Sequence, residues 1–275
     1  MRVDSVIEVP KDFWLEFSAS AGVYAVGEVF DGRVDYVKTY QGEALDAVLN
    51  YPMHFTLNDV FKDQQSCYNI KNRIEEEAGQ FEDVDSLGLF LDNHDNPRFL
   101  NNFNNDNAFK NAFIFTMYHR GIPMMYYGGE QGYAGAADPQ NREQLWTNFD
   151  QTSDWYNFVS KVVNARVQNQ IWNSQPNELW VDDKLYVFQR GQTLVAIGNN
   201  YEGTTQQNVS MNGNFNEGDR LCNIFYPNDD CVQVQSGKVE IYLANGEPKV
   251  FVKQSNVDKV SEVRMLNNDY SGFNT

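Results

Sequence analysis

Apolar residues in the first 172 positions alternate between short runs and longer segments with helical spacing. The short runs predict five strands, at residues 2–6, 23–29, 47–51, 87–91 and 124–127. Helical periodicity fills the intervals and predicts helices at residues 10–19, 56–62, 68–78, 107–119 and 155–171. Alternating strands and helices favour a parallel sheet with helices outside it. Five strands are too few for a complete eight-stranded barrel of ordinary size.

From about residue 173 the pattern changes to short runs of alternating apolar and polar residues. Asn-, Gly- and Asp-rich turns separate these runs, which lie at residues 179–181, 185–189, 194–197, 239–243 and 249–252. This spacing is typical of an antiparallel sandwich. The predicted fold class is therefore α/β: a partial TIM (β/α)8 barrel at residues 1–172, followed by an all-β sandwich domain at residues 173–275.

Composition narrows the range of partners. The hydrophobic fraction of 41% is sufficient for a packed core in a chain of 275 residues. The net charge of −17 argues against nucleic acid and anionic membranes, since both bind basic surfaces, whereas a neutral substrate is compatible with it. No apolar run reaches membrane-spanning length. We expect no nucleic-acid partner and no membrane span.

Three cysteines and one sequon bear on the compartment. Cys222 and Cys231 flank the turn-rich segment 227–230, a spacing compatible with a bridged hairpin. Cys67 is then unpaired, or its partner lies outside this chain. No Cys/His cluster indicates zinc. The glycosylation sequon at residues 208–210 matters only if the chain is secreted, and such short motifs often arise by chance.

The most polar strand end is the segment Phe-Leu-Asp-Asn-His-Asp-Asn-Pro-Arg-Phe at residues 90–99. An apolar strand leads directly into amide, imidazole, carboxylate and guanidinium groups. An active site at the C-terminal ends of parallel strands requires such polarity. An Asx turn with a surface ion pair explains the segment equally well when it is taken alone.

Carboxylates also follow two other strands. Asp4 ends the first predicted strand, Glu28 the second, and Asp95 belongs to the polar segment. C-terminal strand ends of a parallel barrel converge on one cleft. Glycosyl transfer needs a carboxylate nucleophile and a carboxylic acid, with further negative charge near the oxocarbenium-like transition state. Arg2, on the same strand face as Asp4, is expected to keep it ionised, although Asp4 and Glu28 taken singly also fit ordinary surface ion pairs.

These motifs carry a family resemblance along essentially the whole chain. Residues 1–6, 27–32 and 93–99 resemble three of the four signature regions of the α-amylase family of glycoside hydrolases, most closely the extracellular fungal-type α-amylases. The resemblance continues through residues 121–131 and 138–143. It implies retaining endo-hydrolysis of α-1,4-glucosidic bonds in starch- or glycogen-type glucans by a secreted enzyme that is a monomer when complete.

The resemblance also implies roles for individual residues. Asp4 is similar to the family nucleophile, Glu28 to the general acid/base, and Asp95 to the carboxylate that stabilises the transition state. Substrate contacts are implied for the remaining polar positions: Arg2 beside Asp4, His94 on the same sugar as Asp95, Asp138 and Arg142 on the donor side, and Gly32 on the acceptor side. Calcium is the implied cofactor, with the backbone carbonyl of Glu8 as a ligand and most other ligands outside this chain.

Two departures from the family pattern keep alternatives open. Ile7 and Glu8 replace the usual Lys-His pair that contacts sugar on the acceptor side, which favours a cell-wall 4-α-glucanotransferase as one alternative. A non-catalytic, amylase-like glucan-binding protein is another. Second, the chain begins where the family has its fourth barrel strand, without a signal peptide. We therefore expect a sequence truncated at its N-terminus, strands 4–8 of the barrel, and an isolated piece that is inactive.

Overall fold

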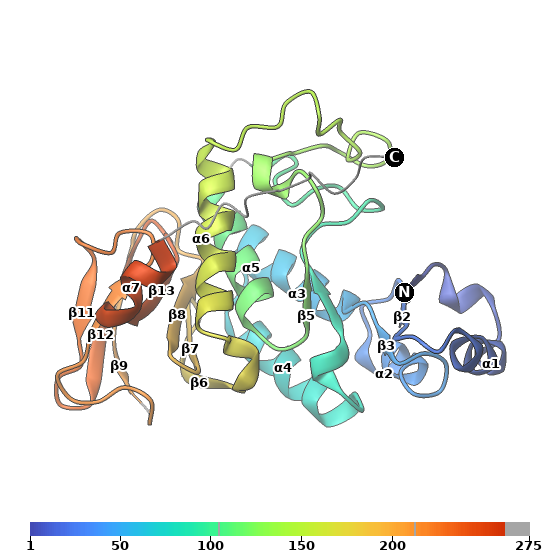
Figure 1. Cartoon of the computed structure of the whole chain (residues 1–275), viewed down its shortest axis with the longest axis horizontal. Helices are drawn as coiled ribbons and strands as arrows, with labels where there is room; N and C mark the ends of the chain where they lie inside the picture. Colours follow the sequence, from blue (N-terminus) through green and yellow to red (C-terminus); the bar gives the residue numbers. More distant parts are fainter. Residues whose placement is uncertain (104, 212, 262–275) are drawn as a thin grey trace, which may run out of the picture.

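The computed structural model describes residues 1–103, 105–211 and 213–261. Residues 262–275 of the predicted sandwich domain lie outside this range. Figure 1 shows the N-terminal strands with helix α1 at one end of the molecule, the C-terminal sheets at the other, and α5 and α6 between them.

Five short parallel strands are present in the described part of the chain, as the sequence predicts. They are β1 (Arg2–Val3), β2 (Val26–Gly27), β3 (Ala47–Val48), β4 (Gly88–Phe90) and β5 (Ile122–Met124). The first three pair in the order β1-β2-β3, and β4 pairs with β5. A parallel bridge between Leu49 and Gly88 joins the two groups. All five C-terminal strand ends therefore lie on the same side.

Helices connect these strands. The α-helices are α1 (Lys11–Ala21), α2 (Val34–Val37), α3 (Tyr51–Leu57), α4 (Tyr68–Gln80), α5 (Asp106–Tyr118) and α6 (Asp154–Gln168). Short 3-10 turns are η1 (Val6–Glu8), η2 (Lys38–Tyr40), η4 (Val84–Ser86), η5 (Gly129–Gln131) and η6 (Ile171–Asn173), and η3 (Asn58–Lys62) is a π-helical turn. Helix α5 is the most deeply buried of them, because nearly its whole surface packs in the main core.

The predictions were wrong at two prolines. The helix predicted at residues 56–62 starts earlier, at Tyr51, since Pro52 occupies its first turn and the Asn50 side chain accepts the Met53 N–H. The strand predicted at residues 124–127 is instead Ile122–Met124 and contains Pro123. Pro123 is tolerated because β5 is an edge strand within the described residues.

The C-terminal region is antiparallel, as predicted, but has more strands than the sequence indicated. Its strands are β6 (Pro176–Val181), β7 (Leu185–Arg190), β8 (Thr193–Gly198), β9 (Thr204–Ser210), β10 (Arg220–Asn223), β11 (Cys231–Gln233), β12 (Lys238–Ala244) and β13 (Lys249–Lys253), followed by α7 (Gln254–Ser261). Six form a sheet in the order β11-β10-β13-β8-β7-β6, and β12 pairs with β9.

The six-stranded sheet buries both of its faces. On one face Phe188 and Val195 pack in the core that contains α5. On the other face Val187 and Leu194 pack against Val209 of β9, so the two sheets form an unequal sandwich. This arrangement fixes the C-terminal sheet against the helices of the parallel region.

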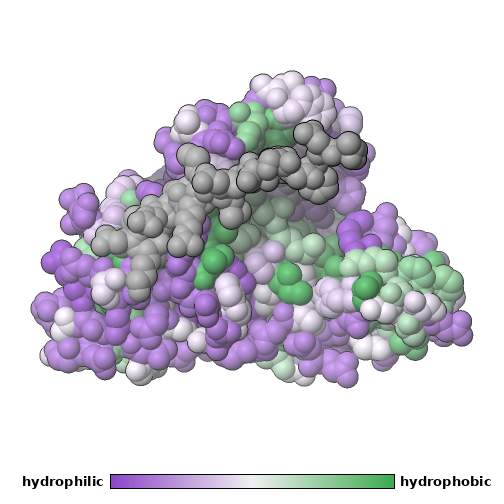
Figure 2. Space-filling view, viewed as in Figure 1, coloured by the Kyte–Doolittle hydropathy of each residue, from purple (hydrophilic) through white to green (hydrophobic). Residues whose placement is uncertain are grey.

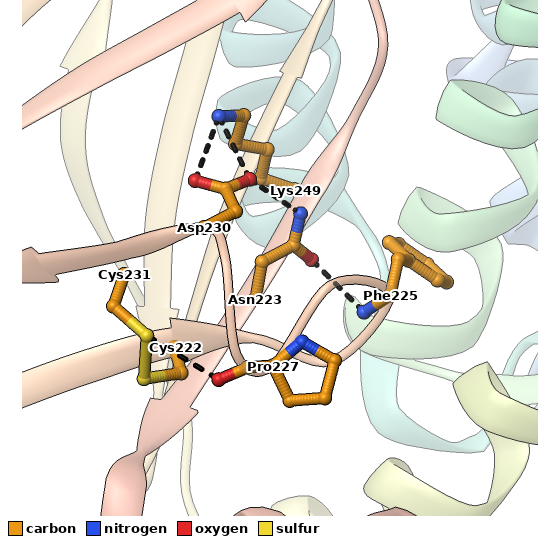
Figure 3. The surroundings of a disulfide bond; sticks show 7 residues. All are labelled: Cys222, Asn223, Phe225, Pro227, Asp230, Cys231 and Lys249. Carbon is orange, nitrogen blue, oxygen red and sulfur yellow. Dashed lines mark hydrogen bonds and ion pairs between the residues drawn. A yellow bond between two sulfur atoms is a disulfide. The ribbon is translucent and has the colours of Figure 1, made fainter.

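A disulfide closes the hairpin of β10 and β11, which confirms the bridged hairpin suggested by the sequence. Cys222 and Cys231 lie directly opposite each other in the register and are bonded. Asp230, beside this bond, accepts from the Asn223 amide at 2.9 Å and pairs with Lys249 at 2.9 Å. Dashed lines mark both contacts in Figure 3. Cys67 is free and buried.

The N-terminal end exposes apolar side chains. Figure 2 shows an apolar area over the end of the molecule that carries α1. Phe13 is 51% exposed and Leu15 is 49% exposed. Within the described residues β1 pairs with β2 and with no second strand. None of the helices among these residues is long and apolar enough to cross a membrane.

Candidate active site

The candidate catalytic side chains follow three parallel strands. Asp4 comes directly after β1, and the left-handed backbone of Ser5, with φ 48°, turns the chain into η1. Glu28 comes directly after β2, and its backbone N–H donates to Val3 at 2.9 Å. Asp95 lies in the loop after β4. The parallel register therefore brings these carboxylates to one edge.

Arg2 is the common partner of the three carboxylates. Its Nη1 lies 3.4 Å from Asp4 Oδ1, and its Nη2 lies 3.3 Å from Glu28 Oε1. The same Nη2 lies 4.0 Å from Asp95 Oδ2. The structure thus joins four of the predicted site residues in one ionic cluster.

Glu28 and Asp4 have opposite electrostatic environments. Glu28 is 8% exposed, and burial, followed by its hydrogen bond with Asp4, raises the pKa of this carboxyl. Asp4 is largely exposed, and the pKa of its carboxyl is lowered by the hydrogen bond with Glu28 and by Arg2. The pair therefore favours a proton on Glu28 and a negative charge on Asp4.

Two further groups hold Glu28 in position. The Tyr51 hydroxyl donates to Glu28 Oε1 at 3.1 Å, and the Ser5 backbone N–H donates to Oε2 at 3.2 Å. Tyr51 in turn accepts from the Asn93 amide at 2.8 Å. Tyr51 was not identified from the sequence, because its place in the site depends on where α3 begins.

The loop after β4 is a tight Asx turn that also carries the predicted site residues. Asn93 Oδ1 accepts the backbone N–H groups of Asp95 at 3.1 Å and Asn96 at 2.9 Å. The Asn141 amide donates to the backbone carbonyls of His94 and Asn96 at 2.9 and 2.8 Å. The structural and functional interpretations of this segment are therefore compatible. Asn141 was not identified from the sequence.

Asp95 also contacts groups from its own loop and from a distant segment. His94 Nε2 lies 3.1 Å from Asp95 Oδ2, and Arg142 Nη2 lies 3.6 Å from Asp95 Oδ1. Arg142 Nε pairs with Asp138 Oδ1 at 2.7 Å. Predicted donor-side residues thus adjoin the carboxylate cluster.

A buried ion pair anchors the segment that carries Arg142. Arg98 is 0% exposed, and its Nε donates to Glu143 Oε2 at 2.8 Å. Glu143 Oε1 accepts the Gly135 backbone N–H at 2.8 Å. The Arg98 guanidinium lies 4.5 Å from the centre of the Tyr126 ring. Arg98 therefore positions the neighbouring loops.

Gly32 and Glu8 lie outside the ionic cluster. A Cβ on Gly32 would come 3.1 Å from the Phe55 ring, so a close packing contact restricts this position. Glu8 is exposed. Among the described residues no group of three or more His, Cys, Asp or Glu side chains could hold a metal ion. These residues do not by themselves form a calcium site, and calcium stays a prediction.

Beside the cluster lies a hollow of about 170 Å³. Arg2, Asn93, His94 and Tyr126 are among the side chains that line it. Arg2 lines this hollow and also pairs with Asp4, Glu28 and Asp95, so the carboxylate cluster adjoins it. A protonated carboxyl beside a carboxylate is the pair of groups that glycoside hydrolases use. The groups at this site are therefore those of the glycoside hydrolase class.

The chain belongs to the α-amylase family: residues 6–214 match the family described as "Alpha amylase, catalytic domain". Alpha-amylase 2 of Schwanniomyces occidentalis is 32% identical over 272 residues, which cover 93% of this chain and 52% of that protein. The Beta/alpha-amylase of Paenibacillus polymyxa is 37% identical over 266 residues, which cover 92% of this chain and 22% of that protein.

Solved structures agree with this assignment. The α-amylase from Malbranchea cinnamomea superposes with a TM-score of 0.84 at 28% identity, over 96% of this chain and 57% of that one. The Anoxybacillus α-amylase has a TM-score of 0.79 at 27% identity, over 92% of this chain and 58% of that one. The chain spans about half, or less, of the length of these curated relatives.

Proposed function

We propose that this chain carries the catalytic carboxylates of a retaining, endo-acting α-1,4-glucan hydrolase of starch- or glycogen-type substrates. The observation that carries the proposal is the ionic cluster in which Arg2 joins Asp4, Glu28 and Asp95, with Glu28 buried and Asp4 open to water.

In the first step Glu28 would protonate the glycosidic oxygen while an Asp4 oxygen attacks the anomeric carbon. The bond to the leaving glucan breaks and a glycosyl ester with Asp4 forms. The raised pKa of Glu28 supports its role as the acid, and the lowered pKa of Asp4 supports its role as the nucleophile.

In the second step Glu28, now ionised, would take a proton from water as the water oxygen attacks the same carbon and releases Asp4. Asp95 would stabilise the positive charge that develops on the sugar ring. His94 and Arg142 orient Asp95 and offer donors for sugar hydroxyls. None of these steps is routed through a metal.

The proposed substrate is a neutral α-glucan, and the proposed enzyme is a secreted monomer. The relative from Schwanniomyces occidentalis is named an α-amylase, which supports this substrate. The disulfide between Cys222 and Cys231 supports an oxidising compartment.

The test is turnover of maltoheptaose by the natural protein, whatever its full length, and by two variants. Asp4→Asn and Glu28→Gln should each lower kcat by several orders of magnitude, because each removes a group that reacts with the substrate. Both are nearly isosteric, and an unfolding transition like that of the wild type controls for folding. Undiminished turnover in either variant would contradict the proposal.

A second candidate function is 4-α-glucanotransfer. Ile7, which is 42% exposed, and the exposed Glu8 stand where family members contact the acceptor sugar. An apolar side chain there can pack against an acceptor sugar but cannot hydrogen-bond to water, which favours a sugar over water as the acceptor. Products longer than maltoheptaose would favour transfer, and shorter products alone would favour hydrolysis. A protein that binds maltoheptaose without turnover would fit the third, non-catalytic possibility.

A further inference from the structure

The sequon at residues 208–210 lies on β9, which pairs with β12 over its whole length. Side chains alternate along this ribbon. Val209 is buried with its cross-strand partner Val239, whereas Asn208 and Ser210 are exposed. Both groups that define an N-glycosylation acceptor therefore face solvent. It is the sole sequon among the 275 residues.

The surroundings of Asn208 leave its amide available. In the part of the chain that the structure describes, no group accepts a hydrogen bond from the Asn208 side chain. Glu240, directly opposite on β12, is occupied by the Gln206 amide. Tyr242, one pair further along the outward face, is 47% exposed and offers ring surface to a sugar.

Two features of the same region are consistent with passage through a secretory compartment. The disulfide between Cys222 and Cys231 requires oxidising conditions of the kind found in the lumen where N-glycans are added. The ribbon of β9 and β12 also has outer edges without a strand partner among the described residues. A bulky, hydrophilic group on this ribbon would protect those edges from pairing with another chain.

We propose that Asn208 is an N-glycosylation site. An oligosaccharide is transferred from a lipid-linked pyrophosphate donor. The bond from its anomeric carbon to the pyrophosphate oxygen breaks, a bond to Asn208 Nδ2 forms, and the displaced amide proton leaves with the lipid pyrophosphate product. The glycan lies on the outward face of the sandwich, on β9 rather than on the strands whose ends carry Asp4 and Glu28. This assignment does not depend on glucan hydrolysis.

The experiment expresses the full chain behind a cleavable secretion leader in yeast cells. Secreted and cell-retained protein are both digested, and the peptide that contains Asn208 is measured by mass spectrometry before and after peptide N-glycosidase, which converts a glycosylated Asn to Asp. Variants are N208Q, S210A and the matched control S210T, which keeps the hydroxyl.

We expect a glycopeptide in the parent chain and in S210T, and its complete loss in N208Q and S210A. Since Ser210 is exposed, S210A and S210T should fold alike. The comparison of these two variants therefore tests whether the hydroxyl at position 210 determines glycosylation of Asn208. Unmodified Asn208 throughout both pools, in cells that glycosylate a control protein, would overturn the proposal. Equal occupancy in S210A and S210T would overturn it as well.

Discussion

Replacement of Arg2 by Met should move both ionisations of the catalytic pair to higher pH. The hydrogen bond with Glu28 lowers the pKa of Asp4 most, and the positive charge of Arg2 lowers it further. It also lowers the pKa of Glu28, against the larger effect of burial. Catalysis as proposed needs ionised Asp4 and protonated Glu28, so the acid limb of activity follows Asp4 and the alkaline limb follows Glu28.

The magnitude follows from the distances. At 3.4 Å from the largely exposed Asp4, a unit charge in a water-like dielectric contributes about 1.2 kcal/mol, and its loss raises the pKa of Asp4. Glu28 lies 3.3 Å from the same guanidinium in a more buried setting, so its shift should be at least as large. The bell-shaped profile should therefore move upward as a whole, without narrowing.

The assay combines a pH–rate profile with ¹³C NMR titration of labelled Asp and Glu carboxyls, which reports both ionisations even without turnover. The Asp4→Asn variant assigns the Asp4 resonance. Arg2→Lys is the matched control, because it keeps the positive charge and should leave both limbs within a few tenths of a unit. Limbs that stay in place in Arg2→Met, or that move in opposite directions, would refute the reasoning.

Three further predictions concern stability and association. Alanine at both Cys222 and Cys231 should lower the free energy of unfolding by about 2.6 kcal/mol, from the loop entropy of a 9-residue separation, and an unchanged urea midpoint would contradict this. Glu143→Ala leaves the buried Arg98 charge unpaired and should cost about 3–5 kcal/mol in urea unfolding, whereas Glu143→Gln, which keeps an acceptor, should cost clearly less. In the isolated 275-residue chain, as distinct from the longer monomer proposed above, Phe13→Ser removes an exposed apolar side chain and should raise the monomer fraction in sedimentation velocity without changing the melting temperature. An unchanged fraction would show that α1 takes no part in association.

Sequence pattern was sufficient where burial follows from local composition. Apolar runs indicated all five parallel strands, although the fifth lies two residues earlier than predicted, and the helical stripe of residues 155–171 became α6. The sequence pattern failed where a strand forms because a distant segment pairs with it. Strand β9 reads Thr-Thr-Gln-Gln-Asn-Val-Ser, and only Val209 among these residues is fully buried. Its strand identity comes from seven cross-strand pairs with β12, which no local periodicity encodes.

At the site, the proximity of the carboxylates could be predicted from the sequence, whereas their protonation could not. That Asp4, Glu28 and Asp95 share one edge follows from parallel strand ends, so the sequence could predict their proximity. Which carboxyl holds the proton could not be predicted in this way. That difference arises because Glu28 is buried while Asp4 remains open to water. Tyr51, the first residue of α3, donates a hydrogen bond to Glu28 and acts in the opposite direction, because a donor to the charged form lowers the pKa of this carboxyl. The acid and the nucleophile are thus distinguished by burial in the folded chain rather than by their own motifs. Tyr51→Phe should accordingly raise the pKa of Glu28 further, since it removes a donor to the charged form.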